Sequence, residues 1–159
     1  MMGIKTNIRT AVENDIPHLV SLAEIHYNLH FKDGKFDPMM AEDYARFTML
    51  DQNSVGLVIE DSTRIPFGYL SGTMSNLYLT NEIDATTHNW FVHNPKFRYG
   101  TRNYGLELLT AFEGWARHHG ARSIRLGMTM MPRHKRVFDR VFKKLNYDVE
   151  TVYYKKDLL

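Results

Sequence analysis

A basic, glycine-containing stretch holds the residues of this sequence whose types and spacing could do chemistry. Residues 94–109, NPKFRYGTRNYGLELL, contain no acid before Glu107 and lead into an apolar helical pattern. The first N–H groups of a helix lack partners within the helix, so a phosphate can accept hydrogen bonds from several of them. Gly100 and Gly105 would let the backbone approach a pyrophosphate, while Arg98 and Arg102 would add positive charge. Two interpretations remain open at this point, a phosphate-binding loop and an ordinary polar turn.

Other side chains with catalytic or metal-binding potential are fewer. The sequence contains no cysteine, which excludes disulfides, thiolate metal sites and a cysteine nucleophile. His26 and His30 stand four residues apart on a predicted helix, a spacing that can chelate a metal. No third ligand is near them in the sequence, so we favour a role in a substrate pocket or at the surface and expect no metal site.

The composition sets the class of protein. A chain of 159 residues with 43% hydrophobic and 24% charged residues is typical of one globular domain, here residues 1–159. The formal net charge of +2 gives no reason to expect a nucleic-acid partner. No apolar run approaches the roughly 20 residues of a membrane span, so we expect no membrane partner and a cytoplasmic location.

The elements that must position these residues form a mixed α/β pattern. Asp37-Pro38 is typical of a helix start, and Gly120 of a helix end. Strands are predicted near residues 4–11, 55–61, 67–75, 81–93, 121–130 and 147–158, and helices near residues 14–30, 37–49, 108–119 and 133–145. The predicted order is therefore β-α-α-β-β-β-α-β-α-β, with one helix crossing over between the fourth and fifth strands.

Two runs of sequence resemble the GNAT superfamily of acetyl-CoA-dependent acyltransferases. They are WFVHNPKFRYGTRNYGLELLTAFEGWARHHGARSIRLGM, from residue 90, and VFDRVFKKLNYDVETVYYKKDL, from residue 137. The most specific piece is LLTAFEGWARHHGA at 108–121. The resemblance covers residues 85–158, and the element order of the first 80 residues agrees with it. It implies an α/β GNAT fold, with a central mixed sheet of about six or seven strands flanked by about four helices.

The resemblance also implies where acetyl-CoA would bind. The cosubstrate would lie where the fourth and fifth strands splay apart, with its pantetheine arm and thioester against the backbone of Phe91, Val92 and His93. Lys135, in the basic run 133–136, could reach the 3′-phosphate of the nucleotide, although such a run is more often a solvated helix start. The pyrophosphate would be held by residues of the basic loop, namely Arg98, Tyr99, Gly100, Thr101, Arg102, Asn103, Tyr104 and Gly105.

Acetyl transfer to an amine requires a proton acceptor and donors for the oxyanion. The amide of Val92 could supply an oxyanion donor. His88 could serve as the base, because imidazole titrates near neutrality, but a strand histidine facing solvent is the alternative. The acceptor would enter between the first two helices (26–38) and the segment 79–87. There Glu82 and Asp84, together with Asp33, could attract a cationic amine.

Three departures from the family pattern bear on activity. Phe142 stands where a proton-donating tyrosine is expected, and Phe142 is better explained as a core aromatic residue than as part of the cofactor site. Asn146-Tyr147 replace Gly-Phe after the last helix. Where a carboxylate base is expected, the fourth strand offers Thr86 and His88, and the candidate carboxylates Glu82 and Asp84 lie only at its entrance. Asn103 stands where a glycine would precede Gly105, and the loop is about two residues longer than the pattern.

Two functions from different classes follow. The first is an N-acetyltransferase that moves an acetyl group from acetyl-CoA to a primary amine of a protein or small molecule. Direct transfer is expected because no cysteine can carry the acyl group. The alternative is a catalytically inactive GNAT-fold binding or structural protein, for instance one encoded by a bacteriophage and located in the host cytoplasm or the virion. Members of the family often form homodimers, so the resemblance implies that a homodimer is possible here.

Overall fold

The chain folds into two compact units, Met1–Met128 and Thr129–Leu159. The structure is a computed structural model, which describes residues 6–31, 34–77, 79–93, 103–127 and 135–149. The elements of the first unit are β1 (Asn7–Thr10), η1 (Glu13–Asp15), α1 (Ile16–His30), α2 (Pro38–Leu50), β2 (Ser54–Glu60), β3 (Pro66–Asn76), β4 (Ile83–Val92), α3 (Tyr104–His118) and β5 (Ser123–Leu126). The second unit contains α4 (Lys135–Lys144).

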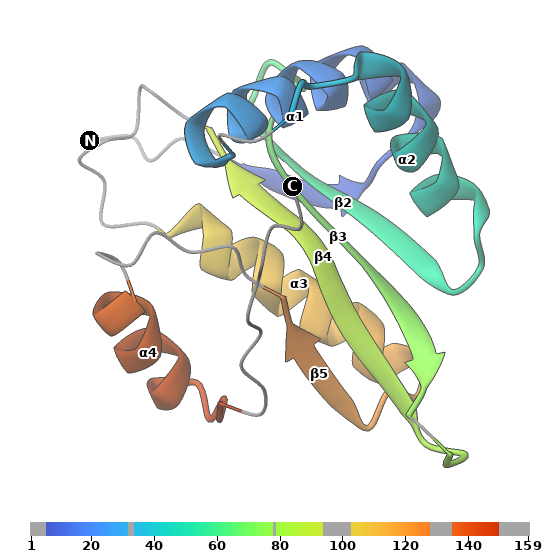
Figure 1. Cartoon of the computed structure of the whole chain (residues 1–159), viewed down its shortest axis with the longest axis vertical. Coiled ribbons are helices and arrows are strands. Elements are labelled where there is room, and N and C mark those ends of the chain that lie inside the picture. Colours follow the sequence, from blue (N-terminus) through green and yellow to red (C-terminus); the bar gives the residue numbers. More distant parts are fainter. Residues whose placement is uncertain (1–5, 32–33, 78, 94–102, 128–134, 150–159) are drawn as a thin grey trace. The chain divides into compact units, whose positions relative to one another are not determined.

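The strands of the first unit form one mixed sheet in the order β1-β2-β3-β4-β5 (Figure 1). Its pairs are antiparallel except β4 with β5, which run parallel because α3 crosses over between them. The mixed α/β class and the predicted order of elements are confirmed from β1 to α4. The described residues contain five strands where six or seven were expected. The predicted strand over 147–158 falls mostly outside them, and residues 147–149 have no regular structure.

Local signals place the helix ends where the sequence predicted them. Asp37 precedes α2, and its Oδ1 accepts hydrogen bonds from the N–H groups of Met39 at 2.9 Å and Met40 at 3.3 Å. At the end of α3, Gly120 adopts a φ of 83°, a left-handed conformation that glycine takes without strain. The N–H of Ala121 then donates to the carbonyl of Ala116 at 2.9 Å, which closes the helix.

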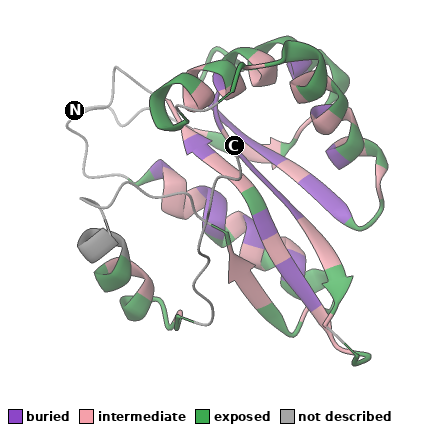
Figure 2. Cartoon of the chain, viewed as in Figure 1, coloured by how far each residue is buried: buried purple, intermediate pink, exposed green. Residues whose placement is uncertain are grey.

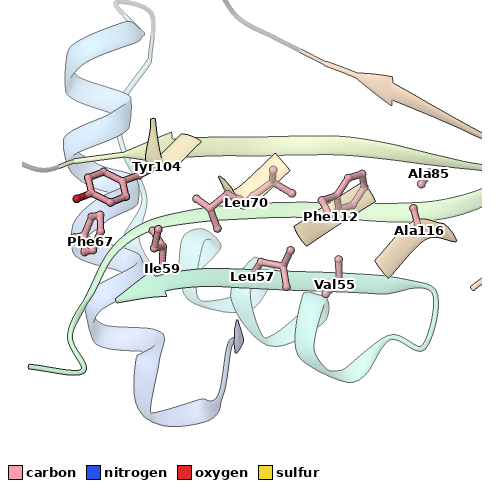
Figure 3. Close-up of a cluster of buried hydrophobic side chains, with 10 residues drawn as sticks. Val55, Leu57, Ile59, Phe67, Leu70, Ala85, Tyr104, Phe112 and Ala116 are labelled. Carbon is pink, nitrogen blue, oxygen red and sulfur yellow. The ribbon is translucent and has the colours of Figure 1, made fainter. Parts of the chain in front are cut away.

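Alternating side chains give the sheet two different faces. On one face, a core cluster joins β2, β3 and β4 to α3, as Figure 3 shows. This cluster comprises Val55, Leu57, Ile59, Phe67, Leu70, Ala85, Tyr104, Leu108, Phe112 and Ala116. Buried residues follow these strands and α3 in Figure 2. The opposite face, which carries Val58, Tyr69 and Ser71, is covered by α1 and α2. The first unit is therefore a three-layer arrangement with the sheet in the middle.

A buried charge network ties the start of α1 to the sheet. The guanidinium of Arg9 lies 2.6 Å from a carboxylate oxygen of Asp15 and 2.7 Å from one of Glu60. Asp15 and Glu60 are 4% and 5% exposed. Each carboxylate also accepts a hydrogen bond from a second residue: Asp15 from the Val12 N–H, and Glu60 from the Asn7 amide. The network thus links β1, β2 and η1 through one arginine.

In the second unit, α4 ends in a well-formed helix cap. Asn146 has a φ of 62°, and the N–H of Tyr147 donates to the carbonyl of Phe142 at 2.9 Å. The two rings of Phe142 and Tyr147 meet edge to face, with centroids 5.8 Å apart. The N–H of Asn146 also donates to the carbonyl of Lys143 at 3.2 Å. The two hydrogen bonds and the ring contact define a Schellman motif, in which asparagine takes the left-handed position that glycine usually fills. Replacement of Gly by Asn146 therefore preserves the end of the helix.

Candidate functional site

The sheet opens at one edge of β4. β5 pairs with β4 only between Asp84 and Thr87, and the N–H of Gly127 reaches the Thr87 hydroxyl at 3.3 Å. Beyond Thr87, the described residues pair β4 with β3 alone. The second half of β4 therefore presents an edge whose backbone groups could pair with an extended ligand, in the way that a peptide adds to a sheet.

A β-bulge at His88 sets which peptide groups face this open edge. Asn89 lies opposite Ser71 and Thr87 lies opposite Gly72, so His88 is the extra residue. The N–H of His93 donates to Phe67 of β3 at 2.8 Å. Because successive peptide groups point to opposite edges of a strand, Phe91 and His93 turn toward β3, whereas Trp90 and Val92 turn toward the open edge. This corrects the expected set: Trp90 joins Val92 there, and Phe91 and His93 do not.

The start of α3 differs from the expectation for the basic loop in two respects. Asn103 has a φ of −99°, so it does not use the left-handed conformation for which asparagine could replace glycine. Instead, its Oδ1 accepts a hydrogen bond from the N–H of Leu106 at 3.2 Å and caps the helix. Tyr104 is 9% exposed and packs edge to face on Phe67 in the core. Its side chain is therefore structural, although its amide and that of Gly105 lie in the first turn of the helix.

A cavity of about 480 Å³ lies between α1, α2 and the face of the sheet opposite α3. It is within the size range of small-molecule sites. The acceptor was expected to enter between segments 26–38 and 79–87. Tyr27, Phe31 and Lys35 of the first segment line the cavity, but no described residue of 79–87 does. The lining residues used below are His26, Tyr27, Phe31, Lys35, Phe36, Asp37, Ala41, Tyr44, Tyr69, Ser71 and Asn89.

His26 connects this cavity to β4. Its ring stacks on Phe91 at 4.6 Å and 5°, and its Nδ1 is 2.9 Å from the hydroxyl of Tyr69. Burial, with a smaller contribution from His30, lowers the pKa of His26 to about 4. Burial likewise raises the pKa of Tyr69 well above its usual range, and Tyr44 adds to the shift. Both groups are therefore neutral at pH 7.

Three further polar groups lie on the floor of the cavity. The hydroxyl of Tyr44 on α2 is 3.1 Å from the hydroxyl of Ser71 on β3. Asn89 is the cross-strand partner of Ser71, and it is half-buried. The floor thus offers hydroxyl and amide groups beside the half of β4 that carries the open edge.

The position of Asp84 corrects its expected role in attracting an amine. Asp84 is 1% exposed, accepts a hydrogen bond from the hydroxyl of Ser123, and lies 2.8 Å from a guanidinium nitrogen of Arg125. That nitrogen is close enough to the second carboxylate oxygen for an ion pair, but the geometry is not that of a hydrogen bond. Seven residues of strand also separate Asp84 from Phe91, a distance of about 23 Å. Asp84 therefore stabilises the β4–β5 pair.

Glu82 and His88 are also placed away from the cavity. Glu82 forms an ion pair with Arg122, next to the start of β5. His88 is exposed on the bulge, where its Nε2 is 2.7 Å from the Thr73 hydroxyl. Neither residue lines the cavity. His88 thus occupies the position of a solvent-facing strand histidine, the alternative that the sequence left open.

The remaining expected site residues lie either outside the described residues or in the second unit. Arg98, Tyr99, Gly100, Thr101 and Arg102 lie outside the described residues, as does Asp33. Lys135 begins α4, and its side chain also lies outside the described part. Phe142 belongs to the second unit, where it packs against Tyr147.

Sequence reasoning missed most of the residues that line the cavity. Tyr44, Tyr69, Ser71 and Asn89 belong to elements that were predicted correctly, but nothing in their local pattern distinguished them. His26 was noted for its spacing from His30 and assigned to a pocket or the surface, and it does line the cavity. An available signal was the polar and aromatic residues at alternate positions of β3, on the face opposite Leu70.

The described residues contain neither a membrane-spanning helix nor a metal-binding group. No helix there has both the length and the apolar character required to cross a bilayer. No group of three or more histidine and acidic side chains there could hold a metal ion.

Comparison with known proteins places the fold. No protein-family model matches the sequence, and no curated protein matches it significantly. Among solved structures, an aminoglycoside N-acetyltransferase in complex with CoA has a TM-score of 0.74 at 14% identity, over 99% of this chain and 97% of that one. An acetyltransferase from Clostridium acetobutylicum, described as predicted and solved with acetyl-CoA, has a TM-score of 0.74 at 15% identity, over 97% of each chain.

A third solved structure agrees with these two. Glucosamine-6-phosphate N-acetyltransferase from Arabidopsis thaliana has a TM-score of 0.70 at 15% identity, over 97% of this chain and 99% of that one. The likeness extends over nearly the whole length of every chain compared. The protein therefore has the fold of the GNAT acetyltransferase superfamily.

Proposed function

We propose that the protein is an N-acetyltransferase that transfers an acetyl group from acetyl-CoA directly to a primary amine. The observation that carries this proposal is the open edge of β4 beyond Thr87, which lies next to the cavity under α1 and α2. An extended thioester arm can pair with the peptide groups of Trp90 and Val92 at this edge. An amine in the cavity can then approach the thioester from the side of Asn89.

The residues present fit a CoA-like ligand at two points. The edge of β4 offers alternate backbone donors and acceptors, which an amide-containing pantetheine arm requires. The first turn of α3, at Tyr104 and Gly105, presents amides suited to a phosphate, and the sequence next to it is basic. Asn103 already accepts from the Leu106 N–H, so the side chain of Asn103 competes with a phosphate for that donor.

The chemistry then needs little from side chains. The neutral amine attacks the thioester carbon, a C–N bond forms, and the nitrogen gives up a proton to water. The C–S bond breaks, and CoA leaves as a thiolate that takes up a proton from water. The Val92 N–H would stabilise the oxyanion that develops on the acetyl oxygen. Because the chain has no cysteine, no thioester with the enzyme is available as an intermediate.

The cofactor site is tested by Asn103→Asp. Aspartate caps a helix as well as asparagine, so the free energy of unfolding should be unchanged or slightly higher. Its added charge should repel the phosphates of CoA and weaken binding by roughly tenfold. Calorimetric titration with CoA and acetyl-CoA measures the affinity, and thermal unfolding provides the control for stability. Equal affinity of the two proteins for CoA would argue that the start of α3 is not the phosphate site.

A second candidate, an inactive GNAT-fold binding protein, is favoured by Phe142. This residue has no hydroxyl to protonate a leaving thiolate, and its ring packs against Tyr147. The inactive protein would bind acetyl-CoA without releasing a free thiol in the presence of any primary amine. The active enzyme would release thiol, and Phe142→Tyr would increase the rate. Thiol release, measured with and without amine, separates the two candidates.

A further inference from the structure

We propose that the cavity under α1 and α2 takes a primary amine with an aromatic or apolar body, bound in its uncharged form. This inference rests on the proposed function and names its acceptor class. It predicts a preference against polycationic acceptors such as polyamines and aminoglycosides. Four properties of the cavity carry it: its ring-lined wall, the absence of an available carboxylate among its described lining residues, its neutral polar floor and its position beside the open edge.

Aromatic side chains, together with aliphatic ones, line the wall of the cavity. The rings of Tyr27 and Phe31 stack with centroids 5.5 Å apart, and the ring of Phe36 lies 5.8 Å from that of Tyr27. His26 and Tyr69 continue this surface toward β4. Rings arranged in this way bury apolar or aromatic groups well, because contact between them adds to the gain from removing apolar surface from water.

The cavity offers little that would hold a positive charge. Among its described lining residues, the only lysine is Lys35 and the only carboxylate is Asp37, with no arginine, and both side chains are exposed. The carboxylate of Asp37 is already engaged by two N–H groups at the start of α2. An ammonium group drawn into this cavity would lose its water without gaining a carboxylate partner, which disfavours the charged form.

The floor can orient an uncharged amine. The Tyr69 hydroxyl is bonded to His26, and the Tyr44 hydroxyl is bonded to Ser71. No hydrogen bond to the Asn89 side chain is found in the described structure, and Asn89 lies opposite Ser71. Its amide oxygen can accept a hydrogen bond from the amine N–H. Trp90, the next residue, turns its peptide group to the open edge where the thioester would lie, so this contact would aim the nitrogen at the acetyl carbon.

The same rings could in principle form a cage that attracts a cation through the ring faces. Such a cage would favour ammonium groups and would reverse the preference proposed here. It does not suit acetyl transfer, because a protonated nitrogen has no lone pair for attack. The experiment therefore compares an aromatic monoamine with two polycationic amines in the same assay.

The first test measures binding without acetyl-CoA, so that it does not depend on turnover. 2-Phenylethylamine, spermidine and kanamycin are titrated into the full chain by calorimetry at pH 8, with Ala41→Phe as the variant that fills the cavity. We expect 2-phenylethylamine to bind at least tenfold more tightly than the other two, and Ala41→Phe to lose this binding while it retains the wild-type circular dichroism spectrum. Tighter binding of spermidine or kanamycin, absence of 2-phenylethylamine binding, or unchanged binding to folded Ala41→Phe would overturn the proposal.

The second test uses Asn89→Asp, which changes one atom group and should fold normally. A carboxylate in the floor should shift the ratio of affinities toward spermidine by at least tenfold. Asn76→Asp is the matched control, because Asn76 is exposed at the end of β3 and does not line the cavity. An unchanged ratio in Asn89→Asp would show that Asn89 does not face the acceptor.

Turnover is measured separately with acetyl-CoA and each amine. Selective binding of 2-phenylethylamine without formation of its N-acetyl product would overturn the proposed function and leave the selectivity of the cavity supported. Acetylation of spermidine or kanamycin in preference to 2-phenylethylamine would support the function and overturn the acceptor class. The two failures are therefore distinguishable.

Discussion

At the scale of the residue, the role proposed for Val92 depends on the direction of its peptide group and not on its side chain. Val92 was expected to contribute through its amide, and the register of β4 turns that amide to the open edge. Phe91 and His93, its neighbours, turn theirs to β3. A residue's backbone role on this strand is therefore fixed by its position relative to the bulge at His88.

Val92→Pro should lower kcat by about 10²–10³-fold, because proline removes the N–H that would stabilise the oxyanion. The ladder to β3 should survive, since the Val92 N–H is not part of it. Val92→Ala is the control: it keeps the N–H and should retain most of kcat, with about 1 kcal/mol of stability lost. Steady-state thiol release measures kcat for both variants. Equal rates would remove Val92 from the mechanism.

Arg9 is a single residue that stabilises the fold through its hydrogen bonds to Asp15 and Glu60. Its hydrogen bond lowers the pKa of Asp15, against the opposing effect of burial. For Glu60, burial alone would raise the pKa, but hydrogen bonds from Arg9 and Asn7 reverse the shift and lower it. Because both folded-state pKa values lie below the unfolded ones, this stabilisation is present above about pH 4 and is lost as the pH falls through the folded values.

Arg9→Met should therefore cost about 3 kcal/mol of unfolding free energy near pH 7, because it leaves two buried carboxylates unpaired. It should also reduce the loss of stability that the wild type shows on acidification below about pH 4. Arg46→Met is the matched control, since Arg46 pairs with Glu13 and Glu42 at the surface, and it should cost less than about 1 kcal/mol. Urea unfolding at several pH values measures both. Equal costs for the two variants would contradict the role of burial.

At the scale of the element, α3 lies unusually close to the sheet at Gly72. A Cβ atom added to Gly72 would lie 2.6 Å from the ring of Phe112 and 2.5 Å from the carbonyl oxygen of Thr86. The absence of a side chain on β3 thus lets the Phe112 ring approach the strand. This contact holds α3 against the strand pair that leads to the open edge.

Gly72→Ala should destabilise the protein by about 1–3 kcal/mol or more, because the added methyl group meets backbone and a ring that cannot both move away. Gly114→Ala provides the opposite case within α3. Nothing lies within 4 Å of its added Cβ, and it should stabilise the helix by up to about 1 kcal/mol. Thermal unfolding should therefore shift in opposite directions for the two variants. A destabilised Gly114→Ala protein would contradict this account of α3.

At the scale of the whole molecule, the fold brings the open edge of β4 and the cavity together, and the sequence has no cysteine to stand between them. The cavity is lined by residues from α1, α2 and three strands, and the edge belongs to β4. In the proposed function, this arrangement would bind both substrates at once. It is consistent with the absence of cysteine from the sequence.

Initial rates should accordingly give intersecting lines in double-reciprocal plots when acetyl-CoA and the amine are both varied. A covalent intermediate would give parallel lines instead. Intact mass measurement after incubation with acetyl-CoA alone should show no added acetyl group that the amine can remove. Parallel lines together with such an adduct would rule out direct transfer.

Much of the fold could be predicted from the sequence because its signals are local. Asp37-Pro38, Gly120 and the alternating strands fixed element boundaries to within a few residues. The departures at Asn103 and Asn146 were also visible, but their consequences were not. Asn103 became a helix cap and Asn146 took a left-handed conformation, because each conformation depends on the hydrogen bonds available at that helix end.

The sequence by itself determined the class of fold, the order of elements and the absence of cysteine chemistry. Only the tertiary structure decided which residues meet. It brought His26 to Tyr69 across 43 positions of sequence, buried Asp84 against β5, and formed a cavity that Asn89 lines and that residues 79–87 do not. The physical reason is that a helix start or a strand period is encoded by neighbouring residues. The register of a sheet and the lining of a cavity depend on contacts between segments that are distant in the chain.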